Sequence, residues 1–434
     1  MKELSKIIIA ISLLGVSLSF TSCGIYGKFK SPVTAEQDSI KTPSYKDIFN
    51  DPYLIALIDT ALSRNYDVLV SHEIVEQAKA SLLGAKMAYI PSIAASPSVT
   101  WTTQGGTSSL SYGIAQASWE IDIFGRLTNK MRIAKASKKE AEAYEQAVRS
   151  EIIATVAETY YTLLMLDAQI KTADSAIVSW EESVEAQKSF KQAGSSDEAA
   201  VAQFEANLYS TMAEAKSLRL SLVEAESAMD VLLAREVGGV TPRSTLLETS
   251  LNAGVIESID LQAVRIRPDV REAEYQLEQA FYALNLSRAN WCPDISISGT
   301  LGWNGGLIFS AVGSLLQPIL NSGKNISAVR SAKHGLKAAE YSYSKALLTA
   351  ATEVNNAMAS QKIHRALTID YFNQVESLAR AFDMTKTKMS LGRGTYLEVL
   401  TAQQSLLTAQ YKLISNYMEV LNAGVELFEA LGGR

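Results

Sequence analysis

Hydrophobic residues recur three and four positions apart over most of this chain, which is the spacing of one face of an α-helix. The longest such stretch runs from Arg126 to Ala193 and contains no glycine or proline. A continuous helix of this length would extend about 100 Å. Its apolar positions form a single line that is typical of a coiled-coil seam, namely Val148, Ile152, Val156, Thr159, Leu163, Leu166, Ile170, Ala173, Ile177, Trp180 and Val184.

A second line of the same kind follows a short break at Gly194, Ser195 and Ser196. It comprises Phe204, Leu208, Thr211, Ala215, Leu218, Leu222, Ala225, Met229 and Leu232. Two long seams joined by a turn predict an antiparallel helical hairpin over 126–235. Taken alone, the pattern is equally typical of an all-α scaffold or a cytosolic coiled coil. The flanking segments distinguish these possibilities.

The period changes from helical to alternating in two places, and each predicts a β-hairpin. The first, over 92–123, has strands at 92–101 and 110–123 around Gly105 and Gly106. The second, over 294–320, has strands at 294–303 and 307–320 around Gly305 and Gly306. Amphipathic helices precede both hairpins, beginning near Asp51 and covering 68–87 before the first and 269–290 before the second.

The second half of the chain repeats the order of the first. Pro91 and Pro293 differ by 202 positions (293 − 91), whereas Gly125 and Gly323 differ by 198 (323 − 125), so a four-residue deletion lies in the second β-hairpin. A long helix over 324–391, interrupted only by Gly335, is followed by a turn and a returning helix, which makes a helical hairpin over 324–431. The returning seam is Leu400, Gln403, Leu407, Gln410, Ile414, Tyr417, Leu421, Gly424, Phe428 and Leu431.

We therefore divide the chain into a first repeat, 51–235, an irregular connector, 236–268, and a second repeat, 269–434. The connector contains Gly238, Gly239, Pro242 and Gly254 and has weak periodicity, and we expect it near mid-height of the long helices. Neither helical hairpin can bury its own seam, so the two halves must pack together.

The N-terminal segment has the pattern of an export signal. Two lysines precede an apolar run over 7–18, which is too short to span a bilayer but typical of a secretory signal peptide, 1–22. Cys23 follows Phe20, Thr21 and Ser22, and this resembles a bacterial lipobox, in which the cysteine receives diacylglycerol and an N-acyl chain. The alternative is an ordinary signal peptide with a chance cysteine. Residues 23–50 are polar and predict an extended tether.

Composition and candidate chemistry restrict the functional classes. The 434-residue chain is 47% hydrophobic with a formal net charge of −6, which argues against a nucleic-acid partner. His72, His334 and His364 are dispersed, and no metal-ligand spacing, phosphate loop or catalytic constellation is present in the sequence. Cys292 is interpreted as a small residue beside a strand. We expect neither an enzyme nor a metal or other cofactor.

Four strands of about ten residues are long enough to cross an outer membrane but cannot close a barrel. Open strand edges in lipid would leave backbone groups unsatisfied at several kcal/mol each. Three copies would supply twelve strands, so we predict a mainly α-helical protein with a membrane β-barrel. Helical hairpins would form an α-barrel, and four strands per protomer would contribute to a trimeric 12-stranded barrel. A soluble four-stranded sheet packed on helices is the alternative.

Several motifs resemble the TolC-like outer-membrane factor family, particularly its lipoprotein efflux branch. They are Arg267-Pro268-Asp269-Val270, then Glu272-Ala273-Glu274, Leu277 and Pro293, the glycines Gly125 and Gly323, and Leu391-Gly392 followed by Tyr396 to Gln403. The resemblance implies a homotrimer in the outer membrane of a Gram-negative-type bacterium, with helices in the periplasm. It also implies an exit duct for small molecules, which works with a periplasmic adaptor protein and an inner-membrane pump of the resistance-nodulation-division type.

The same resemblance assigns roles to the two helical turns. Gly194, Ser195, Ser196, Leu391, Gly392 and Gly394 match the tips that meet the adaptor, and Glu398, Thr401 and Arg393 match the pore constriction. A glycine at such a turn is equally explained as a helix C-cap, and a solvated helix face is the alternative for Glu398. Thr401 occupies a position where relatives often carry Asp, which weakens the acidic pattern of the gate.

Two other functions fit the same pattern. One is the outer-membrane duct of a type I protein secretion system. The other is a non-conducting periplasmic coiled-coil lipoprotein with a structural role. Small-molecule efflux is our main hypothesis because the lipobox resembles the efflux branch.

We predict that Cys23 is the mature N-terminus and carries the lipid, since it lies at the end of the apolar run. Mass spectrometry of the purified membrane protein should find an acylated N-terminal peptide that begins at Cys23. Cys23→Ser should reduce membrane sorting more than folding. An unmodified peptide that spans Phe20 to Cys23 would contradict the prediction.

Overall fold

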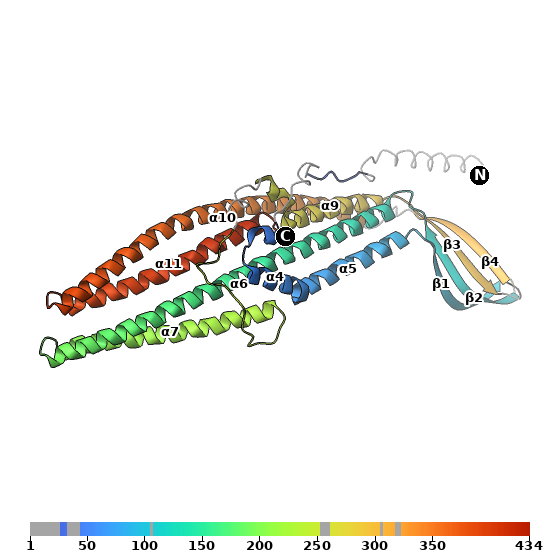
Figure 1. Cartoon of the computed structure of the whole chain (residues 1–434). Helices are drawn as coiled ribbons and strands as arrows, with labels where there is room; N and C mark the ends of the chain where they lie inside the picture. The colour runs from blue at the N-terminus through green and yellow to red at the C-terminus, as the bar shows by residue number, and fades with distance from the viewer. Residues whose placement is uncertain (1–26, 33–43, 105–106, 252–260, 304–306, 317–322) are drawn as a thin grey trace. The chain divides into compact units, whose positions relative to one another are not determined.

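The computed structural model describes residues 27–32, 44–104, 107–251, 261–303, 307–316 and 323–434, and Cys23 and both glycine-glycine loops lie outside this part. The elements in chain order (Figure 1) are α3 (Tyr45–Ile48), α4 (Pro52–Arg64), α5 (Tyr66–Met87), β1 (Ser92–Gln104), β2 (Thr107–Glu120), α6 (Arg126–Gln192), α7 (Glu198–Leu232), the 3-10 helix η1 (Leu261–Ile266), α9 (Pro268–Ala289), β3 (Asp294–Trp303), β4 (Leu307–Leu316), α10 (Lys324–Ser390) and α11 (Tyr396–Ala430).

The chain forms two compact units, and each takes segments from both predicted repeats. Of the described residues, those within 1–35, 71–145 and 268–347 form one unit, and those within 36–70, 146–267 and 348–434 form the other. The first therefore contains all four strands with α9 and parts of α5, α6 and α10. The second contains α7, α11, the connector and the remaining parts of the long helices. The proposed repeat boundaries stay a prediction.

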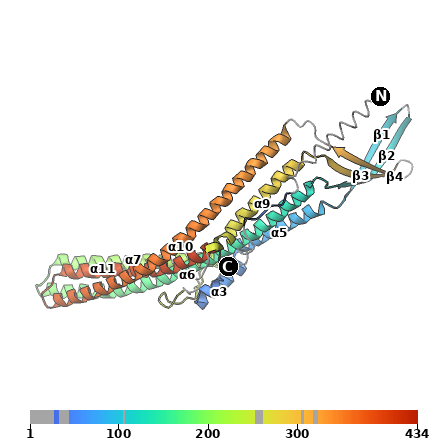
Figure 2. The ribbon, with the colours of Figure 1, turned by 90° about the horizontal axis from the view of Figure 1, so that it is seen from above.

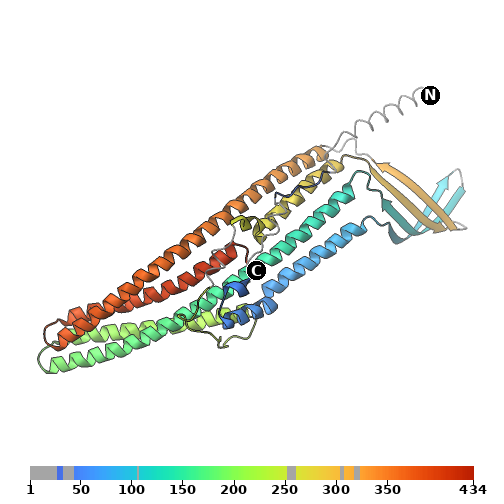
Figure 3. The same ribbon diagram turned by 45° about the horizontal axis from the view of Figure 1, so that its top comes forward.

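The four strands form one antiparallel sheet in the order β1-β2-β3-β4 (Figure 3). The two predicted hairpins are thus joined through the pairing of β2 with β3, for example Trp119 with Ile297. The strand predicted over 110–123 ends earlier, at Glu120, because Asp122 is used to begin α6. Its carboxylate accepts hydrogen bonds from the backbone N–H groups of Leu127, at 2.9 Å, and Thr128, at 2.7 Å.

The second unit contains the packed ends of two helical hairpins, α6 with α7 and α10 with α11 (Figure 2). α6 and α10 are each 67 residues long, and α7 and α11 are each 35. The predicted seams are buried or half-buried throughout. α10 continues through Gly335, where the sequence pattern had suggested an interruption.

The two hairpins share a hydrophobic core near their turns. It consists of Trp180, Val184, Phe204, Leu208, Val399 and Leu400, with Phe382, Met389 and Tyr396 packed against it. The rings of Trp180 and Phe204 meet edge to face, with their centroids 6.0 Å apart. This packing confirms that each seam is covered partly by the other half of the chain.

The residues just before α4 are packed, at the C-terminal end of the segment that we assigned as a tether, 23–50. Ser44 caps the short helix α3, and Tyr45, Ile48 and Phe49 are buried. The Phe49 ring lies 5.8 Å from that of Phe428 on α11. This contact, which local composition does not reveal, holds the segment against the helices.

Arginine side chains fix the connector to the helices of the second unit. Arg243 bonds Asp167 on α6 through Nη2 at 3.1 Å, and Nη1 bonds Glu226 on α7 at 2.8 Å. Arg235 pairs with the buried Asp230, whose carboxylate also accepts a hydrogen bond from the backbone N–H of Gly238 at 2.8 Å. Irregular backbone is thus held by charged hydrogen bonds.

None of the helices in the described part of the chain is long and apolar enough to cross a membrane.

All four long helices of the hairpins end in the same hydrogen-bonded turn. At the end of α6, the N–H of Gly194 bonds the carbonyl of Lys191 and that of Ser195 bonds Phe190, which is a Schellman motif. Gly392 and Gly432 take the equivalent left-handed position after α10 and α11, with φ of 68° and 70°. After α7 the position is held by Ala234, with φ of 48°.

We predict that Ala234→Gly stabilises the protein by roughly 0.5–1 kcal/mol, because the left-handed region costs a residue with a Cβ about 1–2 kcal/mol. Thermal unfolding followed by circular dichroism measures the effect. Ala225→Gly, inside α7, is the matched control and should destabilise by about 1 kcal/mol. An equal loss of stability in both variants would show that Ala234 is not strained.

Candidate functional site

The sheet has one apolar and one polar face. Residues paired across antiparallel strands share a face, and successive residues alternate between faces. Tyr112 pairs with Val99 on β1 and with Trp303 on β3, so these three lie on one face. The registers add Ile93, Trp101, Trp119, Ile295, Ile297 and Leu301 to it. Trp101 is 73% exposed in the protomer, which is unusual for so large an apolar side chain.

Hydroxyl and amide side chains cover the opposite face. Among the residues whose side chains are described, the same registers place on it Ser92, Thr100, Gln116, Ser118, Ser296, Ser298, Thr300 and Ser314, with Ala94 and Val312 as apolar exceptions. Hydroxyls of neighbouring strands bond one another, Ser92 with Ser118 at 2.8 Å and Ser296 with Ser314 at 2.6 Å. Such a sheet can face hydrocarbon on one side and water on the other.

The two helical turns lie at either side of a cleft of about 840 Å³. Five of the predicted tip residues line it, namely Gly194, Ser195, Ser196, Gly392 and Gly394. Gly394 has a steric reason for being glycine, since a Cβ there would lie 3.1 Å from the backbone nitrogen of Met389 and 3.2 Å from the Cβ of Lys388. The structure therefore brings both tips of one protomer together, and their role in adaptor binding stays a prediction.

The residues predicted for the constriction lie at the start of α11, beside this cleft and not within it. Glu398 and Thr401 are exposed in the protomer, as is Arg393 in the turn before them, and Leu391 is 65% exposed. Glu398 also has a local function. Its carboxylate accepts a hydrogen bond from the N–H of Thr395, whose hydroxyl accepts one from the N–H of Glu398, both at 3.4 Å. This is a capping box, which the spacing Thr-x-x-Glu could have revealed.

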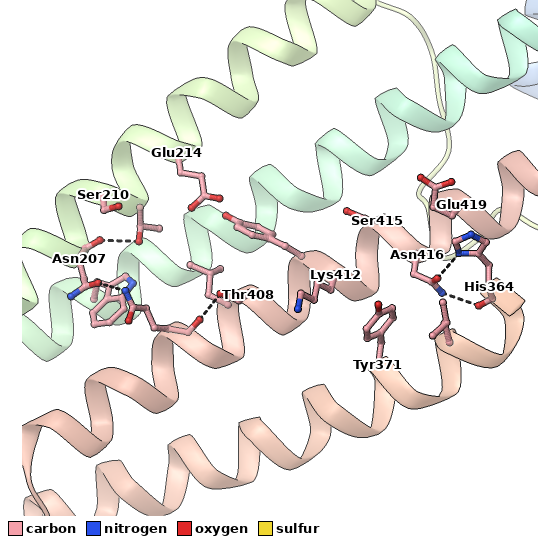
Figure 4. A pocket seen from close by; sticks show the side chains of 16 residues that line it. Asn207, Ser210, Glu214, His364, Tyr371, Thr408, Lys412, Ser415, Asn416 and Glu419 are labelled. Atoms are coloured by element: carbon pink, nitrogen blue, oxygen red, sulfur yellow. Dashed lines mark hydrogen bonds between the residues drawn. The ribbon is translucent and has the colours of Figure 1, made fainter. Parts of the chain in front are cut away.

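A second cleft, of about 550 Å³, runs along α11 and is lined by residues from α6, α7 and α10 (Figure 4). Gln404 on α11 donates to Asn207 on α7 at 2.8 Å, and His364 on α10 bonds Asn416 at 2.9 Å. Burial, followed by the charges of Glu214 and Asp174, raises the pKa of Tyr411 in this cleft to about 12. Sequence reasoning missed the cleft because four separate helices form it.

Carboxylates gather where α11 ends. Arg267 donates to the carbonyl of Ala430 at 2.9 Å and to Glu353 on α10 at 2.6 Å. Burial and the neighbouring carboxylates of Glu158 and Glu151 raise the pKa of Glu429 to about 7. The guanidinium group of Arg267 thus joins α10 to the end of α11.

The histidines and cysteine have ordinary partners or surroundings. His72 bonds Glu145 at 3.2 Å, and burial raises the pKa of the Cys292 thiol, which disfavours a reactive thiolate. Among the described residues, no group of three or more His, Cys, Asp or Glu side chains could hold a metal ion.

A sheet with one apolar and one hydroxyl face, in a chain that also forms long helical hairpins, indicates a protein of a membrane. The family model described as outer membrane efflux protein matches residues 57–235 and 261–433, and the chain belongs to this family. The resemblance inferred from the motifs is thereby confirmed. The protein is an efflux channel of the outer membrane.

Individual relatives are similar over almost their whole length. The solvent efflux pump outer membrane protein SrpC of Pseudomonas putida is 26% identical over 420 residues, which cover 92% of this chain and 89% of SrpC. The probable outer membrane lipoprotein SilC of Salmonella typhimurium is 26% identical over 435 residues, covering 93% and 91%. The solved structure of the outer-membrane channel OprN has the same fold, with a TM-score of 0.86, 23% identity and coverage of 95% and 99%.

Proposed function

We propose that this protein is the exit duct of a tripartite efflux system, and that three copies assemble into one channel. Four strands from each copy would form a 12-stranded barrel, and the helical hairpins would continue it as an α-barrel into the periplasm. The observation that carries this proposal is the two-faced sheet, whose edge strands β1 and β4 each pair with only one described strand. An open edge is costly in lipid, and pairing with neighbouring copies removes it.

The helices support the same assembly. Along α10 in the second unit, large apolar side chains are exposed in the protomer, including Leu348 at 71%, Ile369 at 65% and Phe372 at 55%. Apolar surface of this kind is typical of a buried interface between chains. Three copies also suit the lumen, because a barrel of eight strands from two copies would be filled by side chains.

Small molecules or ions are the proposed cargo. SrpC is named for solvent efflux, and CusC of Escherichia coli, which is 24% identical over 454 residues, is named a cation efflux system protein. These names favour small cargo over the alternative of protein secretion. The proposed partners are a periplasmic adaptor that would dock at the cleft between the tips, and an inner-membrane pump of the resistance-nodulation-division type.

Lipid anchoring is supported by a relative, because SilC is named a lipoprotein. The finer proposal is that Cys23 carries the acyl chains. Several chains bury enough CH₂ groups, at about 0.8 kcal/mol each, to hold a protein stably at a membrane.

Crosslinking of the detergent-extracted protein tests the assembly, and it should yield the mass of three chains. The same particle, reconstituted in planar bilayers, should conduct ions, while heat-dissociated chains provide the negative control. A particle of one or two chains that still conducts would refute the trimer, and a trimer that never conducts would favour the structural lipoprotein.

The gate is proposed at the second tip, where three copies of Arg393, Glu398 and Thr401 would surround the channel axis. We predict that Glu398→Gln lowers the cation preference of the channel, with a larger effect at low salt because screening is weaker there. Gln can replace Glu in a capping box, so stability should be unchanged.

Reversal potentials under a salt gradient measure this preference. Thr395→Ala is the matched control, since it should cost about 1 kcal/mol of stability through the lost cap but keeps the charge. Identical reversal potentials for wild type and Glu398→Gln would place Glu398 on a solvated outer face.

A further inference from the structure

The four described strands contain only two charged residues. β1 and β4 have none, β2 has Glu120 as its last residue, and β3 has Asp294 as its first. Because β2 and β3 are antiparallel, both residues lie at the end of the sheet that joins the helices. The remaining sequence of the strands is neutral, so any electrostatic effect of the sheet comes from this end.

Both carboxylates belong to the hydroxyl face. Glu120 pairs directly with Ser296, and Asp294 precedes Ser296 by two residues on the same strand. Residues two apart on a strand share a face. Neither charge therefore lies on the face with Trp119 and Ile297, where lipid would make a charge costly.

Arg126, the first residue of α6, bridges the two carboxylates. Its Nη2 lies 2.7 Å from Glu120 Oε1, and its Nη1 lies 2.9 Å from Asp294 Oδ2. The ion pairs hold the three side chains in place. Each side chain still reaches solvent, with 25% (Arg126), 28% (Glu120) and 42% (Asp294) of its surface accessible. Two negative charges and one positive charge leave one net negative charge on the cluster.

The cluster is confined to the centre of the sheet. The two sequence repeats show which residues are equivalent. The 198-residue offset relates Glu120 to Pro318 (120 + 198) and Arg126 to Lys324 (126 + 198). The 202-residue offset relates Asp294 to Ser92 (294 − 202). The second strand-to-helix junction thus lacks both carboxylates. If the cluster were needed only to join a strand to a long helix, the same residue types would be expected at both junctions.

We propose that Glu120, Asp294 and Arg126 form a selectivity collar at the junction between the sheet and the helices. This rests on the proposed trimer, in which the hydroxyl face lines the lumen and three clusters surround it with three net negative charges. Fixed charges on the wall of a pore attract counter-ions and exclude co-ions, most strongly at low ionic strength. The collar would favour cations independently of the gate at the tips.

Two substitutions should shift selectivity in opposite directions. Asp294→Asn neutralises the cluster, so the ratio of potassium to chloride permeability should fall toward one. Arg126→Gln leaves two uncompensated carboxylates per copy, so the ratio should rise above that of the wild type. Both changes should shrink in 1 M salt, where the Debye length is about 3 Å.

The controls separate electrostatics from structure. Arg126→Lys keeps the charge and should retain the wild-type ratio, and Ser298→Ala removes a hydroxyl from the same face and should leave the ratio unchanged. If both charge variants conduct with the wild-type ratio, or shift it in the same direction, the cluster is a structural strut and the collar is refuted. If the wild-type trimer does not conduct at all, the proposed function itself fails.

Discussion

The constraint on which the rest of this structure depends is that a sheet in lipid must satisfy every backbone hydrogen bond. Each protomer supplies four strands with a clear division into apolar and hydroxyl faces, and two of those strands are edges. Because apolar and polar residues alternate along each strand, one face of the sheet suits water. The unpaired backbone groups of the edge strands β1 and β4 need further strands as partners. Helices cannot supply them, and this is why the proposed assembly combines strands from several copies of the chain.

The helices satisfy their backbone hydrogen-bonding groups in a different way. Hydrogen bonds are satisfied within each helix, and only its ends leave groups unpaired. The recurring Schellman turns satisfy the C-terminal ends, and side-chain caps at Asp122 and Thr395 satisfy the N-terminal ends. What remains to be covered is apolar surface, and the shared core around Trp180 covers it near the turns. Charged hydrogen bonds from Arg243 and Arg267 then fix the irregular segments to the helices.

The sequence predicted the ends of the two longest helices, α6 and α10, to within one residue, because an apolar pattern that repeats many times outweighs a few ambiguous positions. Local patterns failed where a distant contact decides the structure, as for Phe49 against Phe428, and where a cap competes with a strand, as at Asp122. Among the predicted site residues, Gly194 and Gly392 could be assigned to the turns because glycine is the usual residue at the C-terminal end of a helix. Glu398 forms a capping box with Thr395, which the spacing of the two residues already indicated, and its role in the constriction stays a prediction. The bridge from Arg126 to Asp294 could not be read from the sequence, since it depends on the pairing of β2 with β3.

The equal lengths of α6 and α10, and of α7 and α11, restrict how this protein can evolve. Loss of one residue within a helix turns everything beyond it by about 100°, which would rotate a seam away from its partner. A change of length in one arm would also separate the two tips that now share a cleft. Insertions and deletions are therefore expected in the β-hairpins. The two β-hairpins already differ in this way, because the second is four residues shorter in the sequence.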